Sequence, residues 1–177
     1  MDGILGLVRS IQKDTGERPC KKKIQKIVYL IQEAHEDMGF DYSIYFYGPY
    51  SSGLDSEIRY LCDCGSLSVE ISEHGHKLSV NPLLEASSTD DVVHNEAINK
   101  VISYFGSKTP YELELLATTL YVQRELPQTT ELSRAVEAEI ITGVIKLKGT
   151  KYSKLQIKQA MEELGQQSYF TPQSRLF

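Results

Sequence analysis

Apolar side chains recur with the period of a helix over the first forty residues. In residues 3–14 they are spaced three or four positions apart, which predicts an amphipathic helix that ends at Gly16. The same period runs from Ile24 to Met38 and predicts a second, longer helix that stops at Gly39. Polar and aromatic residues fall on the other face of this second helix, where we expect them to reach solvent or a partner: Lys22, Gln25, Lys26, Tyr29 and Glu33.

The pattern changes to that of a strand after Phe40. Residues 42–47 are rich in aromatic and β-branched side chains, which favour a short strand. We expect Gly48 and Pro49 to end it, because proline lacks an amide donor and fixes its own φ.

A third helix and a hairpin follow. Ser51 or Ser52 is placed to cap the helix, which is expected to end near Gly65. Residues 67–71 and 77–80 alternate between apolar and polar and predict two strands joined by a glycine-containing loop. The order helix, helix, strand, helix, hairpin is typical of a winged helix-turn-helix.

The second half of the chain carries only helical patterns. Residues 81–90, with proline and a Ser-Ser-Thr run, look like a linker. Four helices are predicted after it, with starts at Thr89 or Asp90, Thr109, Thr130 and Ser153. We therefore predict an α+β, mostly α fold: a winged-helix-like module over 1–82, a helical extension over 90–165 packed on it, and a flexible tail over 166–177.

Composition places the chain among globular proteins. Of its 177 residues, 41% are hydrophobic and 24% are charged, which is too apolar for intrinsic disorder. No apolar run approaches the roughly 20 residues that span a bilayer, and the start lacks the features of a signal peptide. The 3 cysteines cannot all pair. We expect a cytoplasmic protein with no membrane partner.

Charge is unevenly distributed along the chain. The total is −5, but residues 36–100 hold 3 Lys/Arg against 12 Asp/Glu, a net charge of −9. This segment contains the third helix and the wing, which would have to approach DNA phosphates in a winged helix-turn-helix. Five lysines in two basic clusters are the better candidates for phosphate contact, although a solvated face is the alternative: Lys22, Lys23, Lys26, Lys151 and Lys154.

Two sequence segments resemble a known family. They are the lysine-rich helix Lys22-Lys23-Ile24-Gln25-Lys26-Ile27-Val28-Tyr29-Leu30 and the element Phe46-Tyr47-Gly48-Pro49-Tyr50-Ser51, followed by Leu54, Leu61, Gly65 and Leu67. Over about residues 20–70 the chain is similar to bacterial and archaeal YwgA-type proteins, which are related to Panacea-type antitoxin domains. The resemblance implies a winged-helix-like core, no established catalytic activity, and an association with mobile elements or defence.

No sequence signature of catalysis or of nucleotide binding is present, so we expect neither an enzyme nor a cofactor. Cys62, Cys64, His74 and His76 are of the residue types that bind zinc. Their spacings differ from those of common zinc fingers, and we expect no metal. The alternative, a Cys₂His₂ site at the wing, is left open.

Tyrosine is concentrated in and around the predicted strand. Its ring is apolar and its hydroxyl is polar, which suits protein interfaces. We expect a contact surface for another protein, with a homodimer as one candidate, formed by Tyr29, Tyr45, Tyr47 and Tyr50. The predicted function is that of a non-enzymatic regulatory protein. The alternative is a winged helix-turn-helix transcriptional regulator that binds DNA, and an undetected enzyme is the least favoured class.

Overall fold

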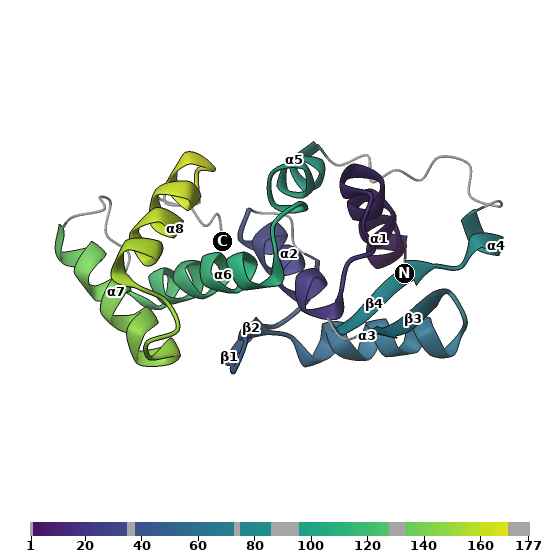
Figure 1. Cartoon of the computed structure of the whole chain (residues 1–177), viewed down its shortest axis with the longest axis horizontal. Coiled ribbons are helices and arrows are strands. Elements are labelled where there is room, and N and C mark those ends of the chain that lie inside the picture. The colour runs from purple at the N-terminus through teal and green to yellow at the C-terminus, as the bar shows by residue number, and fades with distance from the viewer. Residues whose placement is uncertain (1, 35–37, 73–74, 86–95, 128–133, 170–177) are drawn as a thin grey trace. The chain divides into compact units, whose positions relative to one another are not determined.

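The computed structural model describes residues 2–34, 38–72, 75–85, 96–127 and 134–169. The chain is mostly helical, with two small antiparallel hairpins (Figure 1). It divides into two compact units, residues 1–113 and residues 114–177. None of the helices in the described ranges is long and apolar enough to cross a membrane.

The first unit begins with helices and continues with the two hairpins. Its elements are α1 (Asp2–Thr15), α2 (Lys21–Glu33), β1 (Ser43–Tyr45), β2 (Gly48–Tyr50), α3 (Ser52–Asp63), β3 (Leu67–Ser72), β4 (Gly75–Val80), α4 (Pro82–Glu85) and α5 (Glu96–Phe105). The second unit contains most of α6 (Pro110–Glu125), together with α7 (Arg134–Lys148) and α8 (Lys154–Gln166).

Several predicted helix ends are confirmed by the capping contacts. Helix α1 stops before Gly16, which has a φ of 70°. The hydroxyl of Ser51 accepts a hydrogen bond from the Leu54 amide at the start of α3. Thr109 forms the same kind of cap at the start of α6, and Ser153 forms a reciprocal capping box with Gln156 at the start of α8. The predicted starts at Thr89 or Asp90 and at Thr130 lie outside the described residues, as does most of the predicted tail.

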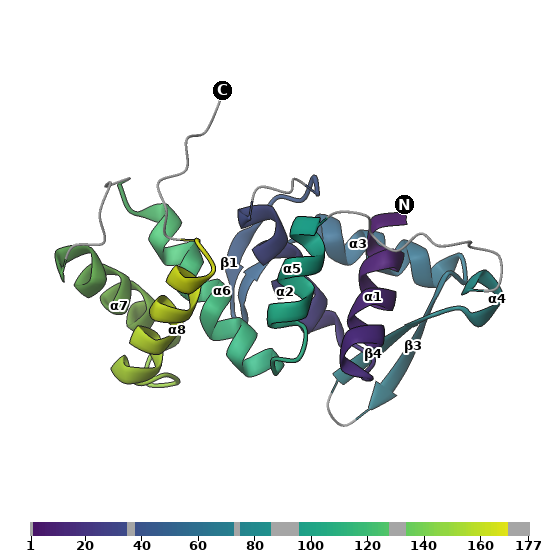
Figure 2. The same cartoon turned by 90° about the horizontal axis from the view of Figure 1, so that it is seen from above.

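Helix α2 differs from its prediction in length and in exposure. It ends at Glu33 instead of near Met38, and all of its residues from Lys23 to Ile31 are buried. The helix packs against α5, β2, β4 and α3 (Figures 1 and 2). The expectation of a solvent-facing polar side was therefore wrong for Gln25, Lys26 and Tyr29, which neighbouring elements cover, whereas Lys22 at the start of the helix is exposed.

The segment after α2 is a hairpin where a single strand was predicted. Strand β1 pairs with β2 in antiparallel register, with Ile44 opposite Pro49 and a turn at residues 46–47. Gly48 does not end the strand but begins β2, with a φ of 84° that other residues rarely adopt. Proline is tolerated at position 49 because each strand of a two-stranded hairpin is an edge strand, in which some backbone amides have no partner strand to donate to.

The second hairpin is present as predicted, formed by β3 and β4, in which Leu67 lies opposite Val80. Its β4 edge is joined to the segment before α2: the Leu78 amide donates to the Pro19 carbonyl at 2.8 Å, and Cys20 bridges to Lys77. Helix α5 packs against α1 and α2 in the same unit, although the sequence predicts it as part of the helical extension.

The second unit is built from helices alone. Most of its buried side chains are apolar residues at helical spacing, including Leu116, Leu120, Ile140, Val144, Ile157, Met161 and Leu164, and Glu114, Thr118 and Thr119 are buried among them. Helix α7 approaches α6 closely at Gly143, where an added Cβ would lie 2.5 Å from Cγ1 of Val122. A glycine at this position is therefore what allows the two helices to pack.

Candidate functional site

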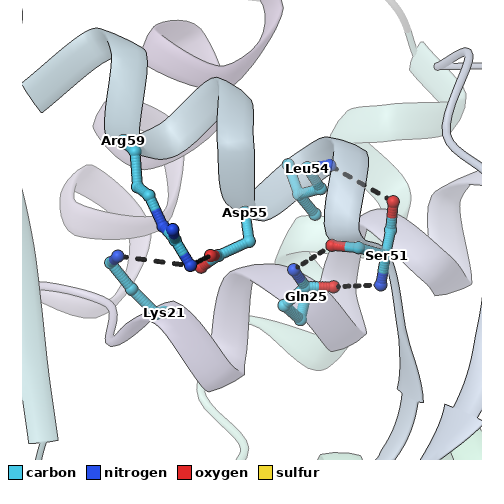
Figure 3. Close-up of polar contacts among 6 residues, drawn as sticks. All are labelled: Lys21, Gln25, Ser51, Leu54, Asp55 and Arg59. Carbon is cyan, nitrogen blue, oxygen red and sulfur yellow. Dashed lines mark hydrogen bonds and ion pairs between the residues drawn. The ribbon is translucent and has the colours of Figure 1, made fainter.

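Helix α2 holds the segment between β2 and α3 through its buried side chains. The Gln25 amide forms two hydrogen bonds with the backbone of Ser51: its Nε2 donates to the Ser51 carbonyl at 2.9 Å, and its Oε1 accepts from the Ser51 amide at 2.9 Å (Figure 3). Gln25 thus pairs with Ser51 as a neighbouring strand would. Both residues are buried, so neither polar group of Ser51 has water as an alternative partner.

Two lysines of α2 make similar contacts with backbone carbonyls. Lys26 Nζ donates to the Pro49 carbonyl at 2.5 Å, and Lys23 Nζ donates to the Gly106 carbonyl at 2.8 Å. Burial lowers the pKa of Lys23, while the negative charge of Glu17 partly opposes that shift. Lys23 and Lys26, two of the lysines predicted to contact phosphate, thus have their ammonium groups pointing into the first unit.

A pair of tyrosines completes the buried side of the hairpin. The Tyr42 hydroxyl donates to the Gln25 carbonyl at 3.1 Å, and the Tyr42 ring lies edge-on to Tyr29 with 5.1 Å between centroids. Burial raises the pKa of Tyr42 well above its usual value. Tyr29, predicted to contact a partner, is only 3% exposed and so does not lie on the surface of this structure.

The turn of the hairpin carries three exposed aromatic residues, which we call the aromatic tip: Tyr45, Phe46 and Tyr47. Their exposed fractions are 61%, 82% and 52%. Tyr45 contacts Phe46 edge-on at 5.3 Å and lies 5.7 Å from the half-buried Tyr50 ring. The structure thus brings together three of the four tyrosines predicted to bind a partner, and it adds Phe46.

A cation lies against the aromatic tip. Lys22 Nζ is 3.7 Å from the centroid of the Tyr47 ring, within the range of a cation–π contact. Lys22 is exposed, unlike the next lysine along α2. Of the three lysines predicted near the start of this helix to contact phosphate, Lys22 is the one whose ammonium reaches the surface.

Charged groups on α3 and on the β3–β4 hairpin are arranged in ion pairs. Asp55 pairs with Arg59 one turn further along α3 and lies 3.7 Å from Lys21 Nζ (Figure 3). On the hairpin, Arg18 Nη1 lies 2.6 Å from Glu70 Oε2. Burial raises the pKa of Tyr50, and the neighbouring Asp55 raises it further. The basic side chains of this face are thus partly neutralised by acidic neighbours.

The residues considered for zinc do not form a cluster in the described part of the chain. Cys62 is half-buried, Cys64 and His76 are exposed, and His74 lies outside the described residues. No group of three or more His, Cys, Asp or Glu side chains among the described residues could hold a metal ion. Cys64 Sγ lies 3.2 Å from the Ser66 hydroxyl, and this hydrogen bond lowers the pKa of the thiol.

The second unit contains the other predicted phosphate-contacting lysines. Lys151 Nζ lies 2.7 Å from Glu114 Oε1, and the buried Lys148 reaches the same oxygen at 2.9 Å. Burial raises the pKa of Glu114, but hydrogen bonds from both lysines outweigh burial and hold it below its usual range. Lys154, at the start of α8, is exposed. Of these two lysines, Lys151 is therefore in an ion pair with Glu114, whereas Lys154 is exposed at the surface.

Comparison with known proteins gives a similarity to one bacterial protein. The chain is similar to a protein of Bacillus subtilis (strain 168) named "Uncharacterized protein YwgA". The two are 29% identical over 112 residues, which is 61% of this chain and 68% of that protein. This similarity supports the resemblance to YwgA-type proteins, whereas the relation to Panacea-type domains stays a prediction. No protein-family model matches the chain.

Sequence reasoning missed the buried polar contacts of α2. Gln25 and Lys26 interrupt a run of isoleucine and valine, and such an interruption suggests an exposed face. The remaining positions of the helix are strongly apolar, and this feature could have indicated burial. A mostly apolar helix can be buried among other elements when its polar side chains form hydrogen bonds inside the protein.

We expect Gln25→Ala to lower the free energy of unfolding by about 1–3 kcal/mol, because it leaves the buried Ser51 amide without this partner and removes one of the two donors to the Ser51 carbonyl, which keeps its bond from the Asp55 amide. Chemical denaturation followed by circular dichroism measures this change. Gln159→Ala, at an exposed position of α8, is the matched control and should change the free energy by less than about 0.5 kcal/mol. Equal effects of the two substitutions would contradict the role of Gln25.

We expect Glu114→Gln to destabilise the protein at neutral pH and to matter less in acid. A carboxyl whose pKa is lower in the folded than in the unfolded state stabilises the fold above the unfolded pKa, and loses this effect as pH falls through the folded pKa. The free-energy difference between wild type and Glu114→Gln should therefore shrink from pH 7 to pH 3. A difference that is constant over this range, as expected for the exposed Glu162→Gln, would refute the assignment.

Proposed function

We propose that this protein acts by binding another protein and not by catalysis, and that the aromatic tip is the centre of the contact surface. The observation that carries the proposal is the exposure of Tyr45, Phe46 and Tyr47 at the end of one hairpin. Exposed aromatic rings gathered at one place are costly in water and are typical of the central residues of protein interfaces.

The attachment of the hairpin supports the proposal. Strand β2 and the residue after it are held by Lys26 and Gln25, so the tip projects from a fixed base. Aromatic side chains have few rotatable bonds, and a fixed backbone reduces the entropy that is lost when a partner binds. Lys22 adds a positive charge at the edge of the surface, where it can pair with an acidic group of the partner.

In this proposal the core of the first unit is a winged helix, with α3 as the third helix and β3–β4 as the wing. Duplex DNA binding, the alternative function of that fold, is disfavoured by the charges. Arg59 and Lys21 are both within ion-pairing distance of Asp55, and Arg18 pairs with Glu70. A DNA-binding face needs cations that are available to phosphates.

The resemblance to Panacea-type antitoxin domains suggests a narrower form of the same proposal. In that form the partner is a toxin that the chain neutralises, and the aromatic tip contacts it. Association of the chain with a second copy of itself through the tip is another form, and it predicts that the oligomeric state depends on the same residues.

Site-specific photo-crosslinking tests the proposal in three steps. A photoreactive phenylalanine analogue at position 46, in the full chain and in the native host, should form a discrete covalent product that includes a second protein chain. The same analogue at Leu83, which is equally exposed in the first unit, should not form it. The captured partner is then purified, and the double variant Tyr45→Ser/Phe46→Ser should weaken its affinity by at least tenfold, or about 1.4 kcal/mol.

The same experiment separates the alternatives. Unchanged affinity of the purified partner for the double variant would refute the aromatic tip as the contact surface. A sequence-selective, salt-resistant DNA complex that is abolished by Arg59→Ala would favour the transcriptional regulator. Circular dichroism of each variant should remain that of the wild type, since the substituted side chains are exposed.

A further inference from the structure

Helices α7 and α8 of the second unit border a groove that is separate from the aromatic tip. The two helices are neighbours, joined by the short connection of residues 149–153. The groove has a volume of about 850 Å³ and is lined by Arg134, Glu137, Ala138, Ile141, Thr142, Ile145, Lys154 and Lys158. This volume is comparable to roughly two turns of a helix with its smaller side chains.

The floor of the groove is an apolar stripe on α7. Ala138, Ile141, Thr142 and Ile145 follow one another at positions i, i+3, i+4 and i+7, so they lie on one face of the helix. The Thr142 hydroxyl donates to the Ala138 carbonyl at 2.8 Å within the same helix. Its hydroxyl thereby has a partner within α7. A stripe of this spacing is what a second helix needs for packing.

The rim of the groove is positively charged. Arg134 lies at the start of α7, and Lys154 and Lys158 are one turn apart on α8. The single acidic residue of the lining, Glu137, is paired with Lys158 at 2.7 Å. Among the described residues, neither Arg134 nor Lys154 forms an ion pair, so the lining has a net charge of +2 from three cations and one anion.

We propose that this groove binds an amphipathic helix of a partner protein whose apolar stripe is flanked by acidic side chains. The apolar floor would receive leucine-sized residues at the same i, i+3, i+4 and i+7 spacing, which is the usual mode of helix-in-groove recognition. Arg134 and Lys154, which form no ion pair among the described residues, would pair with glutamate or aspartate beside the stripe. The proposal is independent of the aromatic tip, because every residue of the groove belongs to the second unit.

The apolar floor is what distinguishes this occupant from a nucleic acid. A phosphate backbone would use the lysines and the arginine but would leave the exposed Ala138 and the half-buried Ile145 without an apolar partner. A helix with both features matches the floor and the rim together. Nucleic acid is therefore the alternative outcome of the test.

Fluorescence anisotropy with synthetic peptides tests the proposal on the full chain. The probe is an 18-residue helical peptide with leucine at the four stripe positions and glutamate at the flanking positions. A peptide with lysine at the flanking positions and a scrambled peptide of the original composition are the controls. The acidic peptide should bind in a saturable manner, and both controls should bind at least tenfold more weakly.

Two substitutions in the groove should each weaken the acidic peptide at least tenfold: Thr142→Glu, which places a charge on the floor, and Lys154→Glu, which reverses a charge of the rim. Both positions are exposed, so the fold should be retained, and circular dichroism checks this. Gln159→Glu introduces the same charge on an exposed position of α8 outside the lining and should leave the affinity unchanged. Tyr45→Ser/Phe46→Ser should also leave it unchanged.

Three results would overturn the proposal. The first is an acidic peptide that does not bind, or whose affinity is the same for Thr142→Glu and Lys154→Glu as for the wild type. The second is a scrambled peptide that binds as tightly as the acidic peptide, which would indicate electrostatic attraction without recognition of an amphipathic helix. The third is binding of a 20-nucleotide DNA strand that Lys154→Glu abolishes, in the absence of peptide binding.

Discussion

Polar side chains that are buried in an otherwise apolar helix determine how the first unit is assembled. Gln25 and Lys26 of α2 pair with the backbone of Ser51 and Pro49, at the point where β2 passes into α3. Such contacts are directional, whereas burial of isoleucine and valine is not. The apolar face of α2 drives burial of the helix, and its polar side chains specify where the hairpin leaves the core.

This arrangement links the packing of the first unit to its proposed function. A tight turn would otherwise leave aromatic residues on a mobile loop, where binding would have to order them first. In this protein the backbone beside the turn is fixed by α2, and the rings of Tyr45, Phe46 and Tyr47 stand on that fixed base. The second unit uses a different principle, since its groove combines an apolar floor with unpaired cations at the rim among the described residues.

The positions of most helices and strands could be predicted from the sequence more accurately than the burial of individual side chains. Caps at Ser51, Thr109 and Ser153 could be predicted because each serves its own helix within a few residues. The hairpin of β1 and β2 could not, because a strand that begins at a glycine of positive φ and contains proline contradicts local propensity. The burial of Tyr29, Lys23 and Lys26 depends on elements distant in the chain, which periodicity within one helix does not reveal.

Native-state hydrogen exchange of the Ser51 amide is the most direct test of whether α2 fixes the base of the hairpin. This amide donates to the side chain of Gln25 and not to a neighbouring strand. If Gln25 holds it as described, it should exchange as slowly as amides in the centre of α2, such as that of Val28, through global unfolding only. Exchange at the rate of an open loop, under conditions where Val28 remains protected, would contradict this role of α2.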